Sequence, residues 1–531
     1  MKTKTLLLLA LAILSLSQAK ADTSYWDGSS WSTAWYENGY GSVYHIKTAE
    51  DLAGFSKCFS QGYYMYGQMT GCTIILDNDI DLNGYEWTPI GISNPSNVYC
   101  SFDGTFDGNG HTIKGLHISN VDSYRMGVGL FGVFLNSNAI IKNLKVSGDI
   151  NVTPNGYSYS VGGMAGYIQA SNVQIEDCTS DVKITVNSGS SDDSNRIGGV
   201  VGALYIDTEG SNGYVKRCSF TGNISSSTAC HAIGGIIGTD SQTPISECSS
   251  KATIDGIVAF VGGIVGESYT GTVADCFYQG NISVYGSIIY AGGISGNCMN
   301  IKNCVTIPSF VFKGGNYMYS DPIEVMSSSD GSYHIENCYY QGDAGKYGTY
   351  MSESELKSGE PLNGFDTDIW TFEKGSYPAL SFTIQKYKVF VNTEHGIFGT
   401  LVKEGGNANL SLDTDEDWVI SNLFVNDVDC TYMLENNVLT LKDITEDKHI
   451  SIVYTNPTNI SALKKTAENG SVSIKDGKLV LKDFSNNTRV SIYNMDGKLL
   501  ENRVINSEDS FNLPSGIYII KAGMKSFKVA L

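Results

Sequence analysis

The sequence has few basic residues for its length. Lysine and arginine number 35 against 55 aspartate and glutamate residues, and the formal net charge is -20. Because such a chain repels phosphate groups, nucleic acid is not an expected partner. Motifs of common catalytic and metal sites are also missing: there is no HExxH sequence, no phosphate-binding loop, no Ser-His-Asp order and no Cys-x-x-Cys pair. The sequence therefore identifies no catalytic, cofactor-binding or metal-binding residue.

Long apolar runs are absent except at the N-terminus. Lys2 and Lys4 precede the run Leu6–Leu16, and Ala19 and Ala21 form a small-x-small cleavage site. This order predicts a secretory signal peptide over residues 1–21. The run is too short to span a bilayer and no later run replaces it, so we expect no membrane span in the mature chain.

A glycine-rich phrase repeats through the middle of the chain, and its Gly-Gly pairs are separated by 36, 36, 28 and 30 residues. Its copies are GGMAG at 162–166, GGVVG at 198–202, GGIIG at 234–238, GGIVG at 262–266 and GGISG at 292–296, with a degenerate GLFG at 129–132. A second phrase keeps the same order and ends in cysteine, at Cys178, Cys218, Cys248, Cys276, Cys304 and Cys338. Two markers in step indicate one repeating structural unit.

Each repeat contains short strands and no amphipathic helix. Runs such as VQIEDC and VKITV alternate apolar with polar residues, are rich in β-branched side chains and are separated by Gly, Asn, Ser and Asp. Repeats of about 30 residues built only from strands and turns predict a right-handed parallel β-helix, a solenoid whose coils stack at the ~4.8 Å strand spacing. The Gly-Gly pairs would then allow close backbone approach.

The repeated cysteines have two interpretations. Cysteine behaves as a small apolar residue, so a row of thiols in one interior position is favoured. Disulfides within the row are less favoured, because stacked strands hold Cβ atoms near ~4.8 Å and a disulfide needs ~3.8 Å. The better disulfide candidates are Cys58, Cys72, Cys100, Cys230, Cys298 and Cys430, and the first three are close enough in sequence to include a pair.

The segments around the repeats follow a characteristic order. HIKTAEDLAGF, which contains a helix expected at Ala49–Lys57, precedes ILDNDIDL, WTPIG, FDGTFDGNGHTIKGL and the GGxxG repeats, and TYMSESELKSG and YPAL follow them. This order resembles the GLUG-motif β-helix proteins, which are mostly exported surface proteins of bacteria. The resemblance covers residues 25–382 and implies a β-helix domain with an N-terminal cap over residues 22–382.

Two groups of polar residues before the repeats have a structural and a functional interpretation. Asp77, Asp79 and Asp81 alternate along a strand and would close turns or, less favoured, bind calcium. His111 and His117 are expected on one face of a strand, where a structural role is favoured over acid-base catalysis.

The aromatic residues near the mature N-terminus also have two interpretations. They would form a plug over the open end of the β-helix, which we favour, or a platform on which sugars stack. The group consists of Tyr25, Trp26, Trp31, Trp35, Tyr36 and Tyr40.

Residues 386–455 lack the glycine phrase and alternate in short strands such as NLSLD, WVISNLFV and HISIVY. They resemble the small β domains of divergent internalin-type bacterial repeats, with Asp417-Trp418 in place of the usual Gly-Tyr. Such domains usually serve as spacers. We expect a small β-sandwich-like domain here.

Residues 459–531 end in LPSGIYIIKAGMKSFKVAL. Pro514, Gly516, Ile517 and Tyr518 match the PxGxY motif of the type IX secretion system C-terminal sorting domain, and Lys528 begins its basic-apolar terminus. This domain is confined to Bacteroidota. The resemblance implies a second β-sandwich-like domain, the type IX secretion machinery as a partner, and a secreted or outer-surface location reached through the periplasm.

Together these features predict an exported, non-catalytic, adhesin-like protein of the cell surface, which presents a β-helix face to a glycan or a host protein. The alternative is a polysaccharide lyase or glycosidase on the same scaffold. Such enzymes work with carboxylates and basic residues on one face and need no local motif. Two or three charged side chains that converge on one face of the folded chain would favour this alternative.

Overall fold

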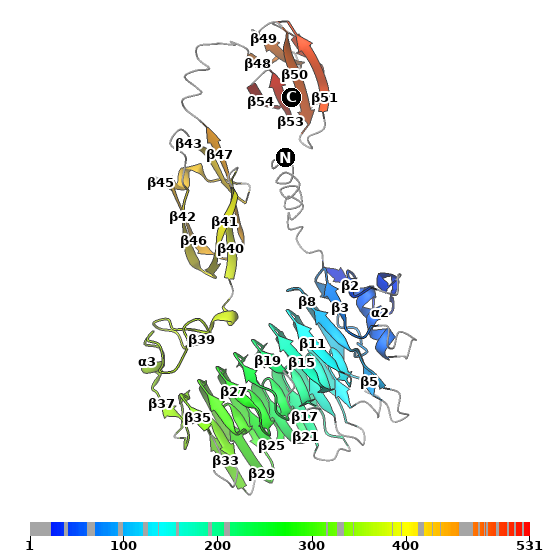
Figure 1. Cartoon of the computed structure of the whole chain (residues 1–531), viewed down its shortest axis with the longest axis vertical. Coiled ribbons are helices and arrows are strands. Elements are labelled where there is room, and N and C mark those ends of the chain that lie inside the picture. Colours follow the sequence, from blue (N-terminus) through cyan, green and yellow to red (C-terminus); the bar gives the residue numbers. More distant parts are fainter. Residues whose placement is uncertain are drawn as a thin grey trace. The chain divides into compact units, whose positions relative to one another are not determined.

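The structure is a computed structural model of the chain (Figure 1). It describes residues 23–530 except 37–40, 61–68, 94–98, 121–125, 136, 155–158, 190–193, 207–212, 315–316, 327–333, 344, 385, 394–395, 413–418, 427, 436, 456–470, 476–477, 483, 485–486, 495–498, 507–508, 514–516 and 523–524. The predicted cleavage site at Ala19 and Ala21 lies outside these residues. The chain is mainly β with long parallel sheets, and it divides into two compact units between residues 384 and 385.

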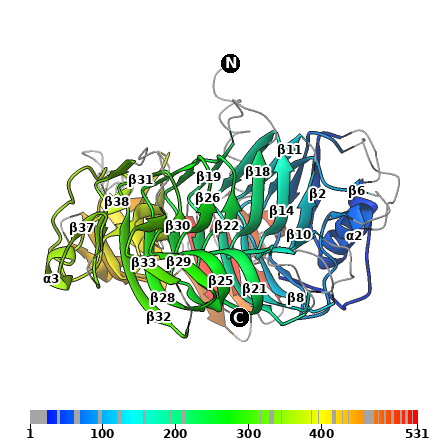
Figure 2. The same ribbon diagram turned by 90° about the horizontal axis from the view of Figure 1, so that it is seen from below.

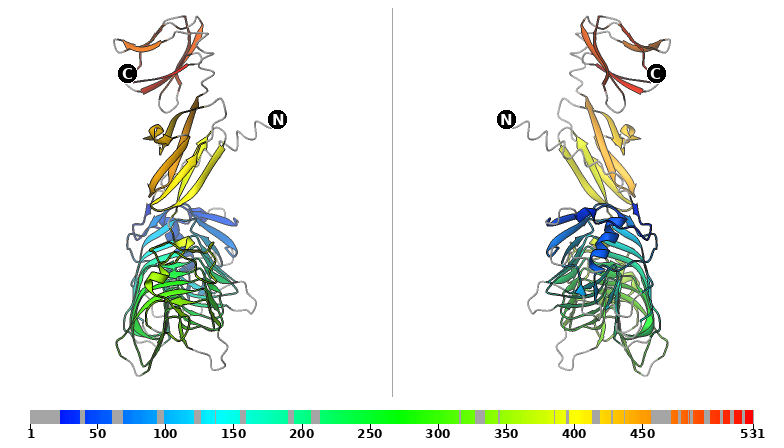
Figure 3. Two further views of the ribbon diagram at one scale, coloured as in Figure 1. Left: turned by 90° about the vertical axis from the view of Figure 1, so that its left-hand side faces the viewer. Right: turned by 90° about the vertical axis from the view of Figure 1, so that its right-hand side faces the viewer.

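Three long parallel sheets, which we call A, B and C, build the first unit. In each repeat the chain passes through sheet B, twice through sheet A and once through sheet C, and then returns to sheet B beside its previous strand. One such repeat consists of β15 (Asn172–Glu176) in sheet B, β16 (Thr179–Val186) and β17 (Asn195–Gly198) in sheet A, and β18 (Val201–Ile206) in sheet C. Figure 3 views this unit from its two ends.

The remaining strands follow the same order. Sheet B also contains β2 (Val43–Ile46), β3 (Cys72–Leu76), β7 (Gly104–Asp107), β11 (Asn138–Lys142), β19 (Tyr214–Lys216), β23 (Ile245–Ser246), β27 (Thr272–Ala274), β31 (Asn300–Lys302) and β35 (His334–Glu336). Sheet C also contains β10 (Phe131–Phe134), β14 (Ala165–Ala170), β22 (Ile237–Asp240), β26 (Val265–Ser268), β30 (Ser295–Asn297) and β34 (Glu324–Met326). Sheet A also contains β1 (Ser24–Tyr25), β4 (Ile80–Asp81), β8 (Thr112–Ile118), β9 (Gly127–Val128), β12 (Lys145–Val152), β13 (Ser160–Gly162), β20 (Ser219–Phe220), β21 (Asn223–Gly234), β24 (Ser249–Ser250), β25 (Thr253–Gly262), β28 (Phe277–Tyr285), β29 (Ile288–Gly292), β32 (Val305–Phe312), β33 (Tyr317–Asp321), β36 (Tyr339–Tyr340) and β37 (Thr349–Tyr350).

The repeated cysteines fill one interior position, as the packing interpretation predicted. All six are buried free thiols. Each Sγ lies near the carbonyl oxygen of the residue two positions earlier, as between Cys248 and Ser246 at 3.2 Å. Burial raises the pKa of the Cys218 and Cys276 thiols, so both stay protonated at neutral pH.

The Gly-Gly pairs lie where each repeat passes from sheet A to sheet C. A Cβ atom on Gly199 would collide with the carbonyl oxygen of Gly235, and one on Gly235 would collide with that of Gly263. Neither Gly199 nor Gly235 has a positive φ. Close approach of neighbouring backbones, rather than an unusual backbone conformation, therefore requires glycine here.

Helix α2 (Ala49–Ser60) packs at the N-terminal end of the sheets (Figure 1). Its predicted start is confirmed: Asp51 and Thr48 each accept a hydrogen bond from the other's amide at 3.2 Å. Trp35 makes edge-to-face contacts with Tyr44 and with Phe55 of the helix. Part of the N-terminal aromatic group is therefore in a cap.

The other aromatic residues of this group differ in exposure. Trp26 is buried against Trp87, and Tyr36 packs on the core. Tyr25 and Trp31 remain 60% and 41% exposed. Tyr40 lies outside the described residues.

After the last repeat, helix α3 (Glu353–Leu356) opens a segment that packs on the outside of sheet A. Leu356, Phe365 and Trp370 form an apolar cluster with Phe277 and Val305. This segment covers apolar side chains that the last repeats direct away from the interior.

The second unit contains two hydrophobic cores. The first lies between a sheet of β41 (Gly396–Lys403), β40 (Lys386–Thr393), β47 (Lys448–Thr455), β43 (Val419–Val425) and β44 (Val428–Asp429) and a sheet of β42 (Gly406–Ser411), β46 (Val438–Ile444) and β45 (Leu434–Glu435). The second lies between β48 (Ser471–Lys475), β49 (Lys478–Lys482) and β52 (Asp509–Phe511) and the strands β51 (Leu499–Ile505), β50 (Thr488–Asn494), β53 (Ile517–Ala522) and β54 (Lys525–Ala530).

Candidate functional site at the corner of sheets A and C

Polar side chains from several repeats gather outside the core, at the corner where sheet A meets sheet C. Arg196 comes from β17, Tyr205 from β18, His231 from β21, Glu267 from β26, and Tyr269 follows β26. We call these five residues the corner cluster. His231 Nε2 lies 2.6 Å from Glu267 Oε2, and the Glu267 residue is only 4% exposed.

Side chains on the outer surface pack against one another at this corner. Ala203, Ala232 and Thr239 are fully buried although they lie outside the interior core, so neighbouring side chains of the outer surface cover them. Gly198 lets β17 and β18 approach closely here, because a Cβ atom on it would collide with the carbonyl oxygen of Val201. The corner therefore shields Glu267 from the solvent, whereas Tyr269 stays 45% exposed.

The tyrosines of the corner cluster are protonated hydrogen-bond donors at neutral pH. Burial raises the pKa of Tyr205, and the nearby Arg196 opposes this rise. Burial also raises the pKa of Tyr269, and the Glu267 carboxylate adds to the rise. Neither phenol is therefore suited to remove a proton as a phenolate near pH 7.

Two buried polar atoms at the corner have unused hydrogen-bonding capacity. Arg196 donates from Nη1 to the carbonyl oxygen of Ser194 at 2.7 Å, but its buried Nε has no hydrogen-bond partner among the described residues. The buried Thr239 hydroxyl, next to Glu267 in the sheet register, also has no hydrogen-bond partner among the described residues. Buried polar atoms normally find a partner, so this corner has capacity for water or a ligand.

A row of aromatic rings continues the corner cluster along sheet A. The His231 ring lies 5.3 Å from that of Phe260, and Phe260, Tyr290 and Tyr319 stack at 5.3 Å with planes 13° and 9° apart. These residues occupy equivalent positions of β25, β29 and β33. Because the rings cover one another's faces, the row presents mainly ring edges and phenol hydroxyls.

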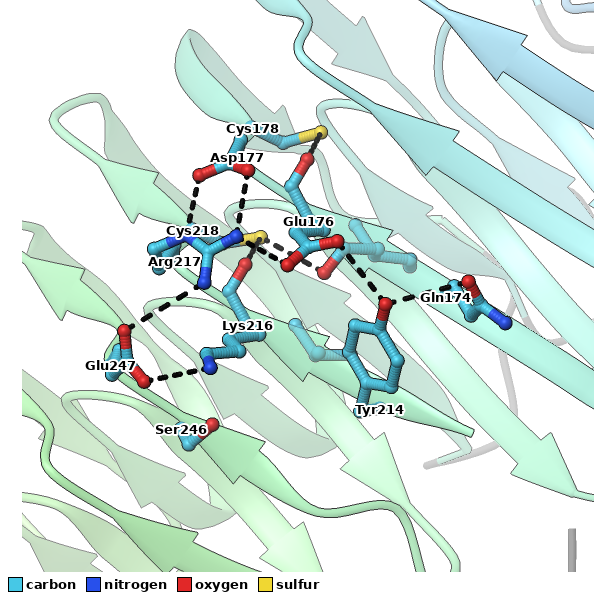
Figure 4. A network of polar contacts seen from close by, with 12 residues as sticks. Gln174, Glu176, Asp177, Cys178, Tyr214, Lys216, Arg217, Cys218, Ser246 and Glu247 are labelled. Atoms are coloured by element: carbon cyan, nitrogen blue, oxygen red, sulfur yellow. Dashed lines mark hydrogen bonds and ion pairs between the residues drawn. The ribbon is translucent and has the colours of Figure 1, made fainter. Parts of the chain in front are cut away.

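A second polar network lies on sheet B (Figure 4). Arg217 binds Asp177 through Nε at 2.6 Å and Nη2 at 2.9 Å, and it also contacts Glu176. Lys216 Nζ lies 3.0 Å from Glu247 of the next repeat. Asp177 raises the pKa of Arg217. These carboxylates are all paired with cations of a neighbouring repeat, so the network joins repeats and leaves no free acid among its members.

This network also supports an unusual backbone conformation. The residue before each repeated cysteine is left-handed, with φ of 49° to 54° from Asp177 to Asn337. Asn and Asp tolerate this conformation, whereas Arg217 and Glu247 do so at a cost of about 1 kcal/mol each. The ion pairs hold both residues in place, which makes a structural role the better interpretation of this network.

The acidic residues singled out from the sequence pair with different neighbours. Asp77 bonds to His45 at 2.7 Å, Asp79 to His111 at 3.1 Å, and Asp81 lies 3.2 Å from Lys114. Each carboxylate thus links one turn of the chain to another.

The expectation that His111 and His117 lie on one strand was wrong, because β8 begins at Thr112, after His111. A bulge where β8 pairs with β12 breaks the alternation at Gly115, which has φ of 68°. His117 bonds to Asp149 at 2.9 Å, away from the partner of His111.

The residues of the proposed sorting motif are described only in part. Ile517 and Tyr518 begin β53, and Lys528 pairs with Ile519 in β54. Tyr518 is buried in the last core. Pro514 and Gly516 lie outside the described residues. No described helix is long and apolar enough to cross a membrane.

Sequence reasoning missed the corner cluster. Its members come from three repeats, and no two of the five are adjacent in sequence. One signal was available: aligning the Gly-Gly pairs places Arg196, Phe260 and Tyr290 in one column, two residues before the first glycine.

Comparison with known proteins identifies no family. No family model matches the chain. The chain is 33% identical over 141 residues to a protein of Evansella cellulosilytica provisionally named as a Gly-rich membrane protein, and the match spans 25% of this chain but only 14% of that relative. A crystal structure from Bacteroides ovatus, provisionally named as an immunoglobulin A1 protease, is similar at 20% identity and a TM-score of 0.42, over 64% of this chain and 92% of that one. Likeness at these levels leaves the function to be inferred from the chain's own residues.

Proposed function

We propose that the first unit is a right-handed parallel β-helix of an exported, non-catalytic protein that binds a glycan at the corner cluster. The observation that supports this proposal is the gathering of Arg196, Tyr205, His231, Glu267 and Tyr269 outside the core, with Glu267 nearly buried against His231. Sugar hydroxyls both donate and accept hydrogen bonds. They match a site that offers imidazole, guanidinium and phenol groups, with a buried carboxylate that holds the imidazole in place.

The enzyme alternative has one observation in its favour. Arg196 and Glu267 are two charged side chains on one face, and His231 beside them would serve as a base in elimination from an acidic sugar. Hydrolysis is less well supported. Glycosidases need two carboxylates that reach the substrate, and the carboxylate next to Glu267, that of Asp240, is fully buried and accepts hydrogen bonds from Thr243 and Ser268. The binding function is favoured because His231 Nε2 is already bonded to the Glu267 carboxylate, and because the Tyr205 and Tyr269 phenols are protonated, so none of these groups is free to act as a base.

A glycan array with the mature protein tests the binding function. Glu267→Gln should weaken binding to any glycan recognised by the wild type at least about tenfold, because it removes the charge that holds His231 and Tyr269 in place, an interaction worth about 1.5–3 kcal/mol. The matched control is Glu176→Gln, which alters an ion-paired glutamate of sheet B and should leave binding unchanged. Equal losses in both variants, or no bound glycan, would contradict the site. Release of unsaturated sugars from a bound polyuronate would instead establish the lyase.

We further propose that residues 459–531 direct the protein through the type IX secretion machinery to the cell surface. The support is the match of Pro514, Gly516, Ile517 and Tyr518 to the sorting motif. A reporter that carries residues 1–21 and 459–531 should reach the surface of a host with this machinery, whereas one that carries only residues 1–21 should remain in the periplasm. Surface protease accessibility measures the difference. Equal surface levels of the two reporters would contradict the sorting function.

A further inference from the structure

Each repeat places two strands in sheet A, and the second of them forms the series β9, β13, β17, β21, β25, β29 and β33. Strand β33 is the last strand of this series. It pairs in parallel with β29 on one side, from Tyr317 opposite Ile288 to Asp321 opposite Gly292. The amide of Tyr317 donates to Ser287 and the carbonyl of Asp321 accepts from Gly293, so alternate residues bond to this side. The backbone groups of Met318 and Ser320 therefore face the opposite side, where no described strand pairs with them. Figure 2 shows β33 beside β29 at the end of this series.

The side chains of this edge are apolar and exposed. Tyr317, Met318 and Tyr319 are 61%, 45% and 47% exposed, and Ile288 on the neighbouring strand is 46% exposed. Proteins usually protect such an edge with charged residues or proline. From Tyr317 to Ser320 this strand has neither. The carboxylate of Asp321 is already bonded to the amides of Ile323 and Lys346.

The edge coincides with the end of the aromatic row. Phe260 and Tyr290 each have a ring stacked on the following strand, but Tyr319 has a stacked ring only on its Tyr290 side among the described residues. A strand added to β33 with an aromatic side chain opposite Tyr319 would extend both the hydrogen-bond ladder and the stack of rings.

We propose that the occupant is a second copy of this chain, with the two β33 strands antiparallel about a two-fold axis at Tyr319. Met318 of each copy would then exchange backbone hydrogen bonds with Ser320 of the other, and the two Tyr319 rings would lie opposite each other. Both strands present backbone groups at the required alternate positions, and no charged side chain lies between Tyr317 and Ser320 to repel its symmetry mate.

A two-fold contact through β33 limits the assembly to two copies. At the opposite end of the sheets, α2 buries Leu52, Phe55 and Phe59 in the core. Head-to-tail growth through β33 would need a free strand edge at that end. A two-fold contact uses the same edge twice and closes.

Sedimentation velocity of the mature full chain over a dilution series tests this proposal. The wild type should form a dimer that dissociates on dilution. Tyr319→Lys and Tyr319→Glu should each be monomeric, because like charges would meet at the axis, whereas an equimolar mixture of the two should again form dimers. Tyr432→Lys, which changes an 83% exposed tyrosine of the second unit, should remain dimeric.

Thermal melting must show that all three variants are folded. A wild type that is monomeric at every concentration would overturn the proposal, and would leave the edge to a strand of another protein. Dimers of Tyr319→Lys alone would place the dimer contact elsewhere, and a monomeric mixture of the two charged variants would overturn the two-fold arrangement at Tyr319. None of these outcomes bears on glycan binding at the corner cluster, which is measured separately.

Discussion

Replacing Gly235 with valine is expected to prevent the first unit from folding. A Cβ atom at this position would collide with the carbonyl oxygen of Gly263 and with the side chain of Ser250. Backbone atoms of the neighbouring strand cannot move aside without breaking the parallel ladder between β21 and β25. Overpacking that flexible side chains can relieve costs about 1–3 kcal/mol, so we expect this variant to lose more than about 3 kcal/mol and to accumulate as insoluble protein.

The matched control is Val201→Ile, a second enlargement close to a glycine pair. Val201 is fully buried, but its register neighbour Ile237 shows that isoleucine fits the next strand at the same position. The cost of this change should stay below about 1.5 kcal/mol. Soluble yield and the urea midpoint of unfolding measure both variants. Similar values for the two would show that the Gly-Gly pair is not required for close approach.

Replacing Glu324 with glutamine is expected to flatten the pH dependence of stability. Glu324 is 1% exposed and aligns with Ser295, in a register that Val265 and Ile237 occupy in earlier repeats. Its Oε1 accepts from the amide of Cys298 at 2.9 Å, while the buried Oε2 has no hydrogen-bond partner among the described residues. Burial raises the pKa of Glu324 from 4.5 to about 8, and the charge of Asp321 adds to this rise.

A raised carboxyl pKa means that the native state holds its proton more tightly than the unfolded state. The stabilisation is complete below the unfolded pKa of 4.5 and is lost as the pH rises to about 8. At about 1.4 kcal/mol per pKa unit, the free energy of unfolding should fall by roughly 4–5 kcal/mol over this range. Asp240, whose pKa burial raises to about 6, contributes in the same direction at the acidic end.

Urea unfolding of wild type and variant from pH 5 to pH 8 measures this effect. The stability of Glu324→Gln relative to wild type should increase as the pH rises, because the amide keeps an acceptor for Cys298 without a charge. Glu360→Gln, at an exposed position, should follow the wild type throughout. A constant difference between Glu324→Gln and wild type across the range would mean that Glu324 ionises in the native state as it does when unfolded.

The sequence alone was sufficient for the features that repeat locally. The Gly-Gly pairs and the cysteine phrase recur in step, so they predicted parallel strands, an interior row of thiols and close backbone approach. The α2 start was also readable, because Thr48 and Asp51 act on their immediate neighbours. Each of these features depends on residues within one repeat or one helical turn.

Only the tertiary structure decided which repeats place which side chains together. The register between β17 and β21 shifts next to Arg196, and that between β21 and β25 shifts before Ala229. A shift of one residue changes which side chain faces the neighbouring repeat. The contact between His231 and Glu267 therefore could not be predicted from the spacing of residues in the sequence. The bulge at Gly115 separated His111 from His117 for the same reason. Glu324 likewise became a buried acid because stacking places it where earlier repeats have valine and isoleucine.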